Sequence, residues 1–93
     1  MPRKTVHVMI SGGVQGVGYR AWTERQALAR GLSGWVRNRR NGSVEALFAG
    51  EAEVVDAMVA ACRVGPPQAR VNSVLADERS DEIAGRFEVW ATF

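Results

Sequence analysis

Four glycines fall within eight residues, Ser11 to Gly18, near the start of the chain. Because glycine adopts backbone angles that other residues resist, this segment is expected to form a loop. The residues before it alternate apolar and mixed side chains and predict a strand over Thr5 to Ile10. The residues after it are good helix formers without proline and predict a helix over Tyr19 to Arg30, ended by Gly31. The chain is therefore expected to open with a strand, a glycine-rich loop and a helix.

A hairpin is predicted by the Asn41-Gly42 pair, because both residues accept positive φ angles. With Arg40, this pair joins a second strand over Leu32 to Arg39 to a third over Ser43 to Ala49. Apolar residues alternate along the third strand, so three of them are expected to share one face: Val44, Ala46 and Phe48.

A second helix is predicted over Glu51 to Val64, and Gly65-Pro66-Pro67 ends it. A fourth strand follows over Arg70 to Asp77. Ser80 to Gly85 is a polar turn, and alternating apolar residues predict a last strand over Phe87 to Phe93. The buried side of the second helix is expected to hold Val54, Val55, Met58, Ala61 and Cys62, and that of the first helix Ala21, Trp22, Leu28 and Ala29.

The predicted order is β-α-β-β-α-β with one strand appended at the C-terminus. This order is typical of the α+β, ferredoxin-like split βαβ sandwich. In that fold, two helices cover one face of a mostly antiparallel sheet, which here would have five strands. A length of 93 residues fits one domain, residues 1–93, and leaves no room for a second core.

The composition argues against a membrane-spanning segment and against a metal site. The apolar runs are a few residues long, far below the roughly 20 that span a bilayer. The start of the chain, Met1 to Lys4, has no secretory signal, so a cytoplasmic protein is expected. Cys62 and His7 are the sole residues of their types in the sequence. They cannot make an internal disulfide or the usual zinc and iron ligand sets, and we expect no metal and no cofactor.

The glycine-rich loop has two interpretations when its spacing alone is considered. A glycine turn that enters a helix presents several backbone N–H groups to an anion, with the helix dipole behind them. Arg20 in the first helical turn could then grip two oxygens of one phosphate. Alternatively, the loop is a tight strand-to-helix turn beside an incidental surface arginine. It is neither a Walker loop nor a dinucleotide fingerprint.

Two motifs together resemble the acylphosphatase family. The first is Gly12-x-Val14-Gln15-Gly16-Val17-x-Tyr19-Arg20, and the second runs from Gly34-Trp35-Val36-Arg37-Asn38 through the hairpin to Glu45. They occur in the order the family shows, and the resemblance covers essentially the whole chain. Two departures are visible: Gly13 stands where many relatives have a basic side chain, and Tyr19 replaces a more common phenylalanine.

The resemblance implies an acylphosphatase, a metal-free hydrolase that cleaves the carboxyl–phosphate anhydride of acyl phosphates. It implies that Arg20 binds the phosphate and that Asn38 holds the attacking water, with no covalent intermediate. The expected partner is then a small-molecule acyl phosphate as substrate, and no binding to nucleic acid or to a membrane is expected. The protein is expected to be a monomer. The phosphate-binding loop would consist of Gln15, Gly16, Val17, Gly18, Tyr19 and Arg20.

The remaining reactive or charged residues have plainer interpretations. Cys62 is expected in the core and His7 on the outer face of the first strand, and Ser11 has no base spaced to activate it. The basic cluster near the hairpin is either a solvated face or a surface that steers anions. That cluster is Arg37, Arg39 and Arg40.

The tryptophans are expected to pack in the core or at its edge rather than to form a stacking platform. They are Trp22, Trp35 and Trp90.

The main rival is a non-catalytic ferredoxin-like module that binds nucleic acid or protein. RNA-binding sheets of this type present paired aromatics on central strands within an RNP consensus, which this sequence lacks. A second rival is an acylphosphatase-like domain of a larger assembly, such as one that handles carbamoyl groups in hydrogenase maturation. Such domains belong to much longer chains, whereas this sequence ends at Phe93.

Overall fold

The computed structural model describes residues 2–93, and its element order agrees with the predicted one. Two helices and five strands alternate in the order β-α-β-β-α-β with a short strand appended. The elements are β1 (Arg3–Gly13), α1 (Tyr19–Ala29), β2 (Ser33–Asn38), β3 (Val44–Glu51), α2 (Ala52–Cys62), β4 (Arg70–Arg79) and β5 (Glu88–Val89).

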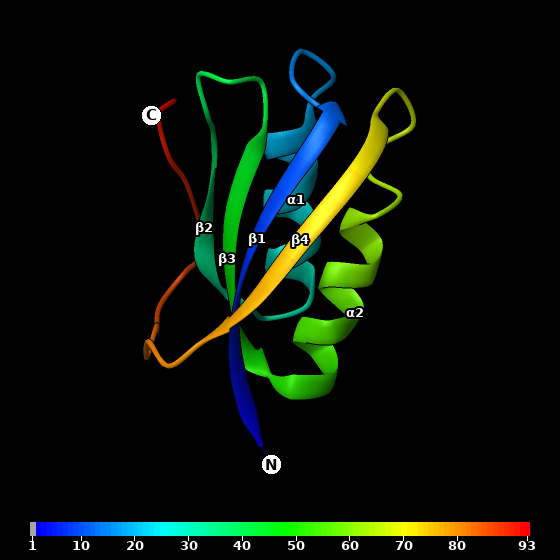
Figure 1. The fold of residues 1–93 in the computed structure, drawn as a ribbon. Helices are drawn as coiled ribbons and strands as arrows, with labels where there is room; N and C mark the ends of the chain where they lie inside the picture. Colours follow the sequence, from blue (N-terminus) through cyan, green and yellow to red (C-terminus); the bar gives the residue numbers. More distant parts are fainter. Residues whose placement is uncertain (1) are drawn as a thin grey trace.

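The strands form one sheet in the order β4-β1-β3-β2-β5. Neighbours are antiparallel except β2 and β5, which are parallel. Both helices lie on the same face of the sheet, as Figure 1 shows. This arrangement confirms the predicted ferredoxin-like fold. It also brings the β1–α1 loop, the β2–β3 hairpin and the C-terminus to one end of the molecule (Figure 1).

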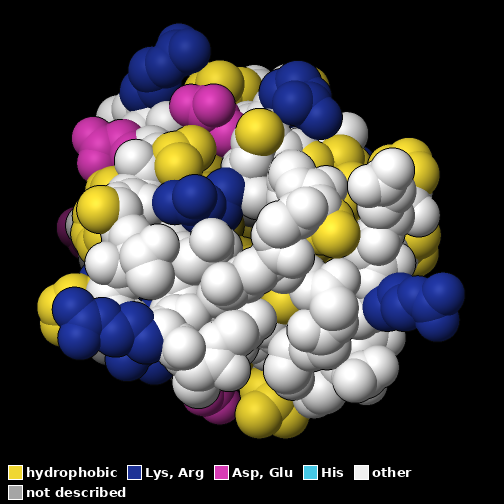
Figure 2. All heavy atoms as spheres, turned by 90° about the horizontal axis from the view of Figure 1, so that it is seen from above, with side chains coloured by type: hydrophobic (Ala, Val, Ile, Leu, Met, Phe, Trp, Pro, Cys, Tyr) yellow, Lys and Arg dark blue, Asp and Glu magenta, His cyan; other side chains and the backbone are white. Residues whose placement is uncertain are grey.

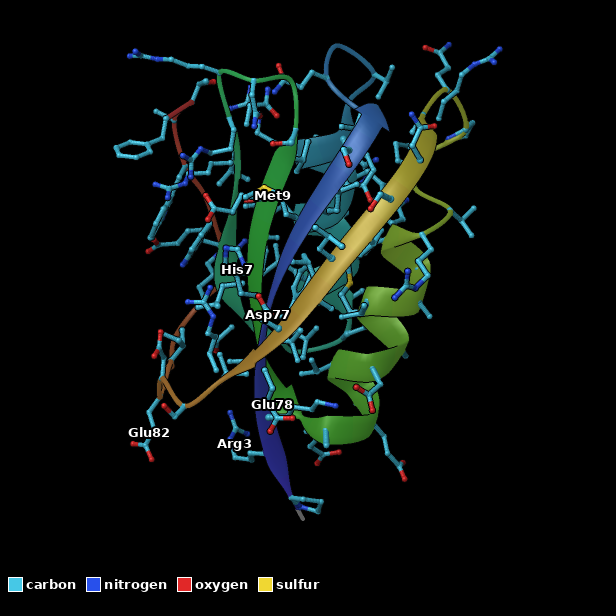
Figure 3. The ribbon with its side chains drawn as sticks, in the orientation of Figure 1. Arg3, His7, Met9, Asp77, Glu78 and Glu82 are labelled. Carbon is cyan, nitrogen blue, oxygen red and sulfur yellow. The ribbon has the colours of Figure 1, made fainter. Side chains whose placement is uncertain are left out.

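The core lies between the sheet and the helices. The alternating residues Val6, Val8 and Ile10 of β1 are buried there, as the period of two in the sequence predicts. The opposite face of the sheet carries the other set, and Figure 3 shows His7 and Met9 of β1 on that side. The apolar residues expected on one face of β3 are all fully buried: Val44, Ala46 and Phe48.

The helix faces agree with prediction for α2 and differ for α1. Val55, Met58 and Cys62 of α2 are buried as expected, with Val59 beside them. In α1 the buried residues are Tyr19, Thr23 and Ala27, whereas Ala21 and Ala29 are exposed. Trp22 and Leu28 pack partly buried against the core as predicted, so the prediction was wrong for the two alanines. It missed Thr23 because hydropathy discounts polar groups. Here the Thr23 hydroxyl donates to the Tyr19 carbonyl (2.8 Å), so its burial leaves no unpaired donor.

The first strand extends further than predicted. β1 continues through a bulge between Ser11 and Gly12 and ends at Gly13, so the loop shrinks to residues 14–18. Gly12 has a φ of 124°, which only glycine adopts readily. Gly12 also has no side chain, which lets the backbone of Arg70 in β4 come close. A Cβ at this position would clash with the carbonyl oxygen of Arg70. A glycine that is needed for close strand pairing was thus interpreted as part of the loop.

The hairpin has a three-residue turn in which only Gly42 has a positive φ (94°). Arg39 N donates to the Ser43 carbonyl (2.9 Å) and closes it. Asn41 keeps a negative φ, against expectation, because its side-chain oxygen accepts bonds from the amide (3.0 Å) and hydroxyl (2.6 Å) of Ser43. The hairpin and its strands are therefore as predicted, and the turn type differs.

The predicted last strand is much shorter in the structure. Only Glu88–Val89 pairs as a strand, and of the alternating residues Phe87 is buried while Val89 and Phe93 are exposed. Beyond Val89 the chain still bonds to β2: Trp90 N donates to the Val36 carbonyl (2.8 Å) and Phe93 N to the Asn38 carbonyl (3.0 Å). These two donors are three residues apart and their acceptors in β2 are two apart, so the C-terminal segment does not keep the regular side-chain alternation of a strand.

Within residues 2–93, no helix has the length and apolar character needed to cross a bilayer.

Candidate active site

The start of α1 is open to an anion. Residues 14–18 connect β1 to this helix, and Gly16 and Gly18 both take left-handed backbone angles (φ 75° and 78°). Gly18 is the N-cap residue, no side chain caps the helix, and its first turn contains no acidic residue. The amides at the positive end of the helix dipole therefore keep their hydrogen-bonding capacity. Such a terminus is suited to phosphate-like anions.

A pocket of about 460 Å³ lies against this helix start. Figure 2 looks onto this end of the molecule and shows Lys and Arg side chains spread around a central area of backbone and uncharged polar groups. Arg20 and Asn38, which are far apart in the sequence, both line the pocket. Of the predicted loop residues, Val17 does not line it and packs against the core instead. Those that do are Gln15, Gly16, Gly18, Tyr19 and Arg20.

Arg20 is half-buried, and its Nη1 donates to the Trp90 carbonyl (3.3 Å). In the described part of the chain it forms no ion pair with a carboxylate. The C-terminal segment therefore orients the guanidinium without neutralising its charge. That charge remains available to a bound anion.

Asn38 is the last residue of β2 and pairs with Val44 of β3. Its carbonyl accepts the Phe93 amide (3.0 Å), so the backbone is fixed from both sides. Over residues 2–93, its side-chain amide makes no hydrogen bond with the protein, although it is half-buried at the pocket wall. A neutral group with a free donor and a free acceptor thus faces the same space as Arg20.

The Gln15 side chain connects the loop to the hairpin. Its Nε2 donates to the carbonyls of Arg39 (2.7 Å) and Ser43 (2.8 Å). The sequence predicted a role only for the backbone amide of this residue. A long polar side chain in a loop next to a hairpin gives no signal of its own, because the contact crosses between elements.

Tyr19 anchors the start of α1 to α2. Its hydroxyl is buried and donates to the Cys62 carbonyl (2.6 Å), and burial raises its pKa further above the ordinary value. Burial likewise raises the pKa of the Cys62 thiol to about 12. A thiol that stays protonated is a poor nucleophile, in agreement with the core position expected for Cys62.

A buried carboxylate that was not among the predicted site residues organises the basic cluster. Glu45 on β3 is 7% exposed and accepts hydrogen bonds from His7 (2.6 Å), Arg37 (2.7 Å) and Arg39 (3.0 Å). Burial would raise its pKa, but these bonds and the charge of Arg37 lower it to about 2. The hairpin register, which places Arg37 opposite Glu45, was the signal that could have revealed this pair.

Aromatic side chains complete this face of the sheet. Trp35 and Trp90 stack with their ring centroids 4.5 Å apart, and the Arg37 guanidinium lies 4.9 Å from the Trp35 ring centre and 4.4 Å from that of Phe93. Two of the three hairpin arginines are thus held by Glu45 and aromatic rings, and Arg40 is exposed. The tryptophans pack against each other, as expected of Trp35 and Trp90.

Most of the chain is similar to known proteins. The family model named Acylphosphatase matches residues 6–89. A protein named Acylphosphatase from Bradyrhizobium diazoefficiens is 65% identical over 77 residues, which cover 83% of this chain and 78% of that protein. The solved acylphosphatase structure from Coxiella burnetii has a TM-score of 0.91 at 35% identity, covering 95% of this chain and 93% of that one. The acylphosphatase structure from Bacillus subtilis gives 0.89 at 35% identity, covering 94% and 98%.

The fold and the pocket together define an α+β protein with two helices on one face of its sheet and a pocket at the uncapped start of α1. The matches give the family: the chain belongs to the acylphosphatase family and is an enzyme of the hydrolase class.

Proposed function

We propose that this protein hydrolyses the carboxyl–phosphate anhydride of acyl phosphates to a carboxylate and inorganic phosphate. Arg20 and the amides from Gln15 to Arg20 hold the phosphoryl group, and Asn38 holds the attacking water. One observation carries this proposal: Arg20 and Asn38 line a single pocket at the uncapped start of α1. Membership of the acylphosphatase family supports it.

The chemistry requires little more than these groups. The departing carboxylate is a weak base, so its departure needs no strong acid. The protein has to neutralise the phosphoryl oxygens and place a water in line with the scissile bond. The water oxygen forms the new P–O bond as the bond to the carboxylate oxygen breaks, and the water proton passes to a phosphate oxygen of the substrate.

Direct attack by water fits the composition of the pocket wall. In the part of the chain that the structure describes, no Ser, Thr, Cys or His lines the pocket. The Tyr19 hydroxyl, on a residue that does line it, is bonded to the Cys62 carbonyl. Among residue types that can form a phosphoenzyme, this wall leaves the Glu24 carboxylate, whose negative charge repels the phosphoryl group.

The first test is the release of inorganic phosphate from acetyl phosphate and from a phosphate monoester such as p-nitrophenyl phosphate. We expect rapid hydrolysis of the anhydride and little of the monoester, whose leaving group is a stronger base. Equal rates on the two substrates, or none on acetyl phosphate, would contradict the proposal.

Arg20→Gln should lower kcat/KM for acetyl phosphate by roughly 100-fold to 1000-fold, the typical effect of removing a key charge-stabilising group. The residue lies at a helix start outside the core, so the far-UV circular dichroism spectrum should not change. Arg25→Gln is the matched control, since Arg25 is exposed on the same helix and does not line the pocket. Wild-type activity in the Arg20 variant would remove this residue from the mechanism.

A further inference from the structure

The two parts of the proposed site come from elements that are distant in sequence. The phosphate loop, residues 14–18, follows β1, and Asn38 ends β2 at the base of the hairpin. The tip of that hairpin, residues 40–42, is exposed to solvent. In-line attack depends on the position of the water relative to the phosphoryl group. The sheet fixes the Asn38 backbone, and a direct contact between the loop and the hairpin would set the remaining alignment of the two.

Gln15 makes that contact. Within residues 2–93, the hydrogen bonds that join the loop directly to the hairpin are the two from Gln15 Nε2. They end on the carbonyls of Arg39, the neighbour of Asn38, and of Ser43, which closes the turn with Arg39. Both bonds are short, at 2.7 and 2.8 Å, and both are partly buried.

A primary amide suits this position chemically. Its two N–H groups meet two carbonyl acceptors, which also fixes the orientation of the amide. It is uncharged, so it adds no field that competes with Arg20 for the phosphoryl group. Asparagine is one methylene shorter, and methionine has a similar length but no donor.

We propose that the Gln15 side chain is a positioning residue, which holds Asn38 and its water in line with a phosphoryl group bound in the loop. This inference rests on the proposed function. The side chain touches neither substrate nor water and acts through Asn38. It predicts a loss in kcat with little change in phosphate binding.

The test compares wild type, Gln15→Met, Asn38→Ala and the double variant. We expect Gln15→Met to lower kcat on acetyl phosphate by about 10-fold to 100-fold, the effect of a displacement on the order of 1 Å. The inhibition constant of inorganic phosphate should change by less than about threefold, because the loop amides and Arg20 remain. In the Asn38→Ala background, Gln15→Met should have no further effect on kcat, since the residue through which it acts is gone.

Three outcomes would overturn the inference. Multiplicative losses in the double variant would show that Gln15 acts independently of Asn38. Weaker phosphate inhibition with unchanged kcat would assign Gln15 to phosphate binding instead. Wild-type kinetics in Gln15→Met would show that the contact has no consequence for turnover.

A stability control separates positioning from general loosening. Val59→Ala removes a buried side chain from α2, away from the pocket, and should lower the midpoint of urea unfolding. Its kcat should stay at the wild-type value at a temperature where every variant is folded. If Val59→Ala loses as much kcat as Gln15→Met, the effect of Gln15 is merely structural.

A binding experiment keeps this inference distinct from the proposed function. Inorganic phosphate is titrated into ¹⁵N-labelled protein, and the amide resonances of the loop and of the Asn38 side chain are followed. In the wild type both sets should shift, and in Gln15→Met only the loop set should shift. This readout needs no turnover. Equal shifts of the Asn38 side chain in both proteins would refute positioning even if acyl phosphate hydrolysis failed.

Discussion

At the scale of single residues, Glu24 gives the pocket a second charge. It lines the pocket one helical turn beyond Arg20, and it forms no ion pair within the described residues. Side chains on a helix lean toward its N-terminus, so this carboxylate leans toward the proposed phosphate site. A carboxylate there repels substrates whose acyl group also ends in an anion.

Glu24→Gln should therefore raise kcat/KM for succinyl phosphate relative to acetyl phosphate by about tenfold, the effect of one like-charge interaction in a partly exposed site. Glu82→Gln, which makes the same change of charge on an exposed loop at the far end of the molecule (Figure 3), should leave the ratio unchanged. The same ratio in both variants would show that Glu24 does not select substrates.

Glu45 links stability to pH. Its folded pKa of about 2 lies below the ordinary value of 4.5, so ionisation of this group stabilises the fold. That stabilisation is fully present above about pH 5 and is lost as the pH falls from there toward 2. Its size is on the order of 3 kcal/mol.

Glu45→Gln should be less stable than wild type near neutral pH and should lose less stability on acidification. Urea unfolding between about pH 7 and pH 3 measures both differences. Parallel stability curves for the two proteins over that range would show that another group controls the acid response.

At the scale of elements, the bulge in β1 determines where the loop begins. Gly12→Ala places a side chain at a positive φ and against the Arg70 carbonyl, so β1 and β4 would have to separate. We expect a loss of more than about 2 kcal/mol. Gly13→Ala is the control, because its Cβ would meet the Arg70 Cβ at an ordinary 3.5 Å.

The Gly13 variant should change stability by less than about 1 kcal/mol in either direction. Chemical unfolding of the two variants beside the wild type gives the comparison. If both glycines tolerate alanine equally well, the bulge does not depend on the backbone conformation of Gly12.

The sequence predicted the elements well where local patterns decide. Alternation found the buried face of β1, and the Asn41-Gly42 pair found the hairpin. It failed where distant parts of the chain decide: Thr23 is buried because its hydroxyl has a partner, and Glu45 because three cationic or ring nitrogens surround it. Arg20 and Asn38 were selected by resemblance. The pocket that they share follows from the β1–β3–β2 pairing, which no local pattern contains.

At the scale of the whole molecule, the proposed mechanism relies on the protein's own positive groups. Over residues 2–93, no three His, Cys, Asp or Glu side chains are grouped so as to hold a metal ion. Because Arg20 and the loop amides supply the positive charge in the proposed mechanism, hydrolysis of acetyl phosphate should continue at the same rate in excess chelator. Phosphate release with and without EDTA measures this. A requirement for added Mg²⁺ would contradict charge neutralisation by Arg20 and the loop amides alone.

The outer face of the sheet offers little support for the rival nucleic-acid-binding function. Trp35 and Trp90 stack on each other, and Glu45 pairs with both Arg37 and Arg39, which offsets one of their two positive charges. A base would have to displace these contacts before it could stack. The acidic end of β4 adds further repulsion for a polyanion, and Asp77 and Glu78 are exposed there.

The stacked pair of indoles also gives the protein an intrinsic optical probe. Two parallel tryptophan rings 4.5 Å apart couple their electronic transitions, and one of the two residues, Trp90, receives the Arg20 guanidinium on its carbonyl. Any ligand that draws Arg20 away from Trp90 disturbs the segment that holds this ring in place. Near-ultraviolet ellipticity and tryptophan emission can therefore follow occupancy of the pocket in real time, without a label.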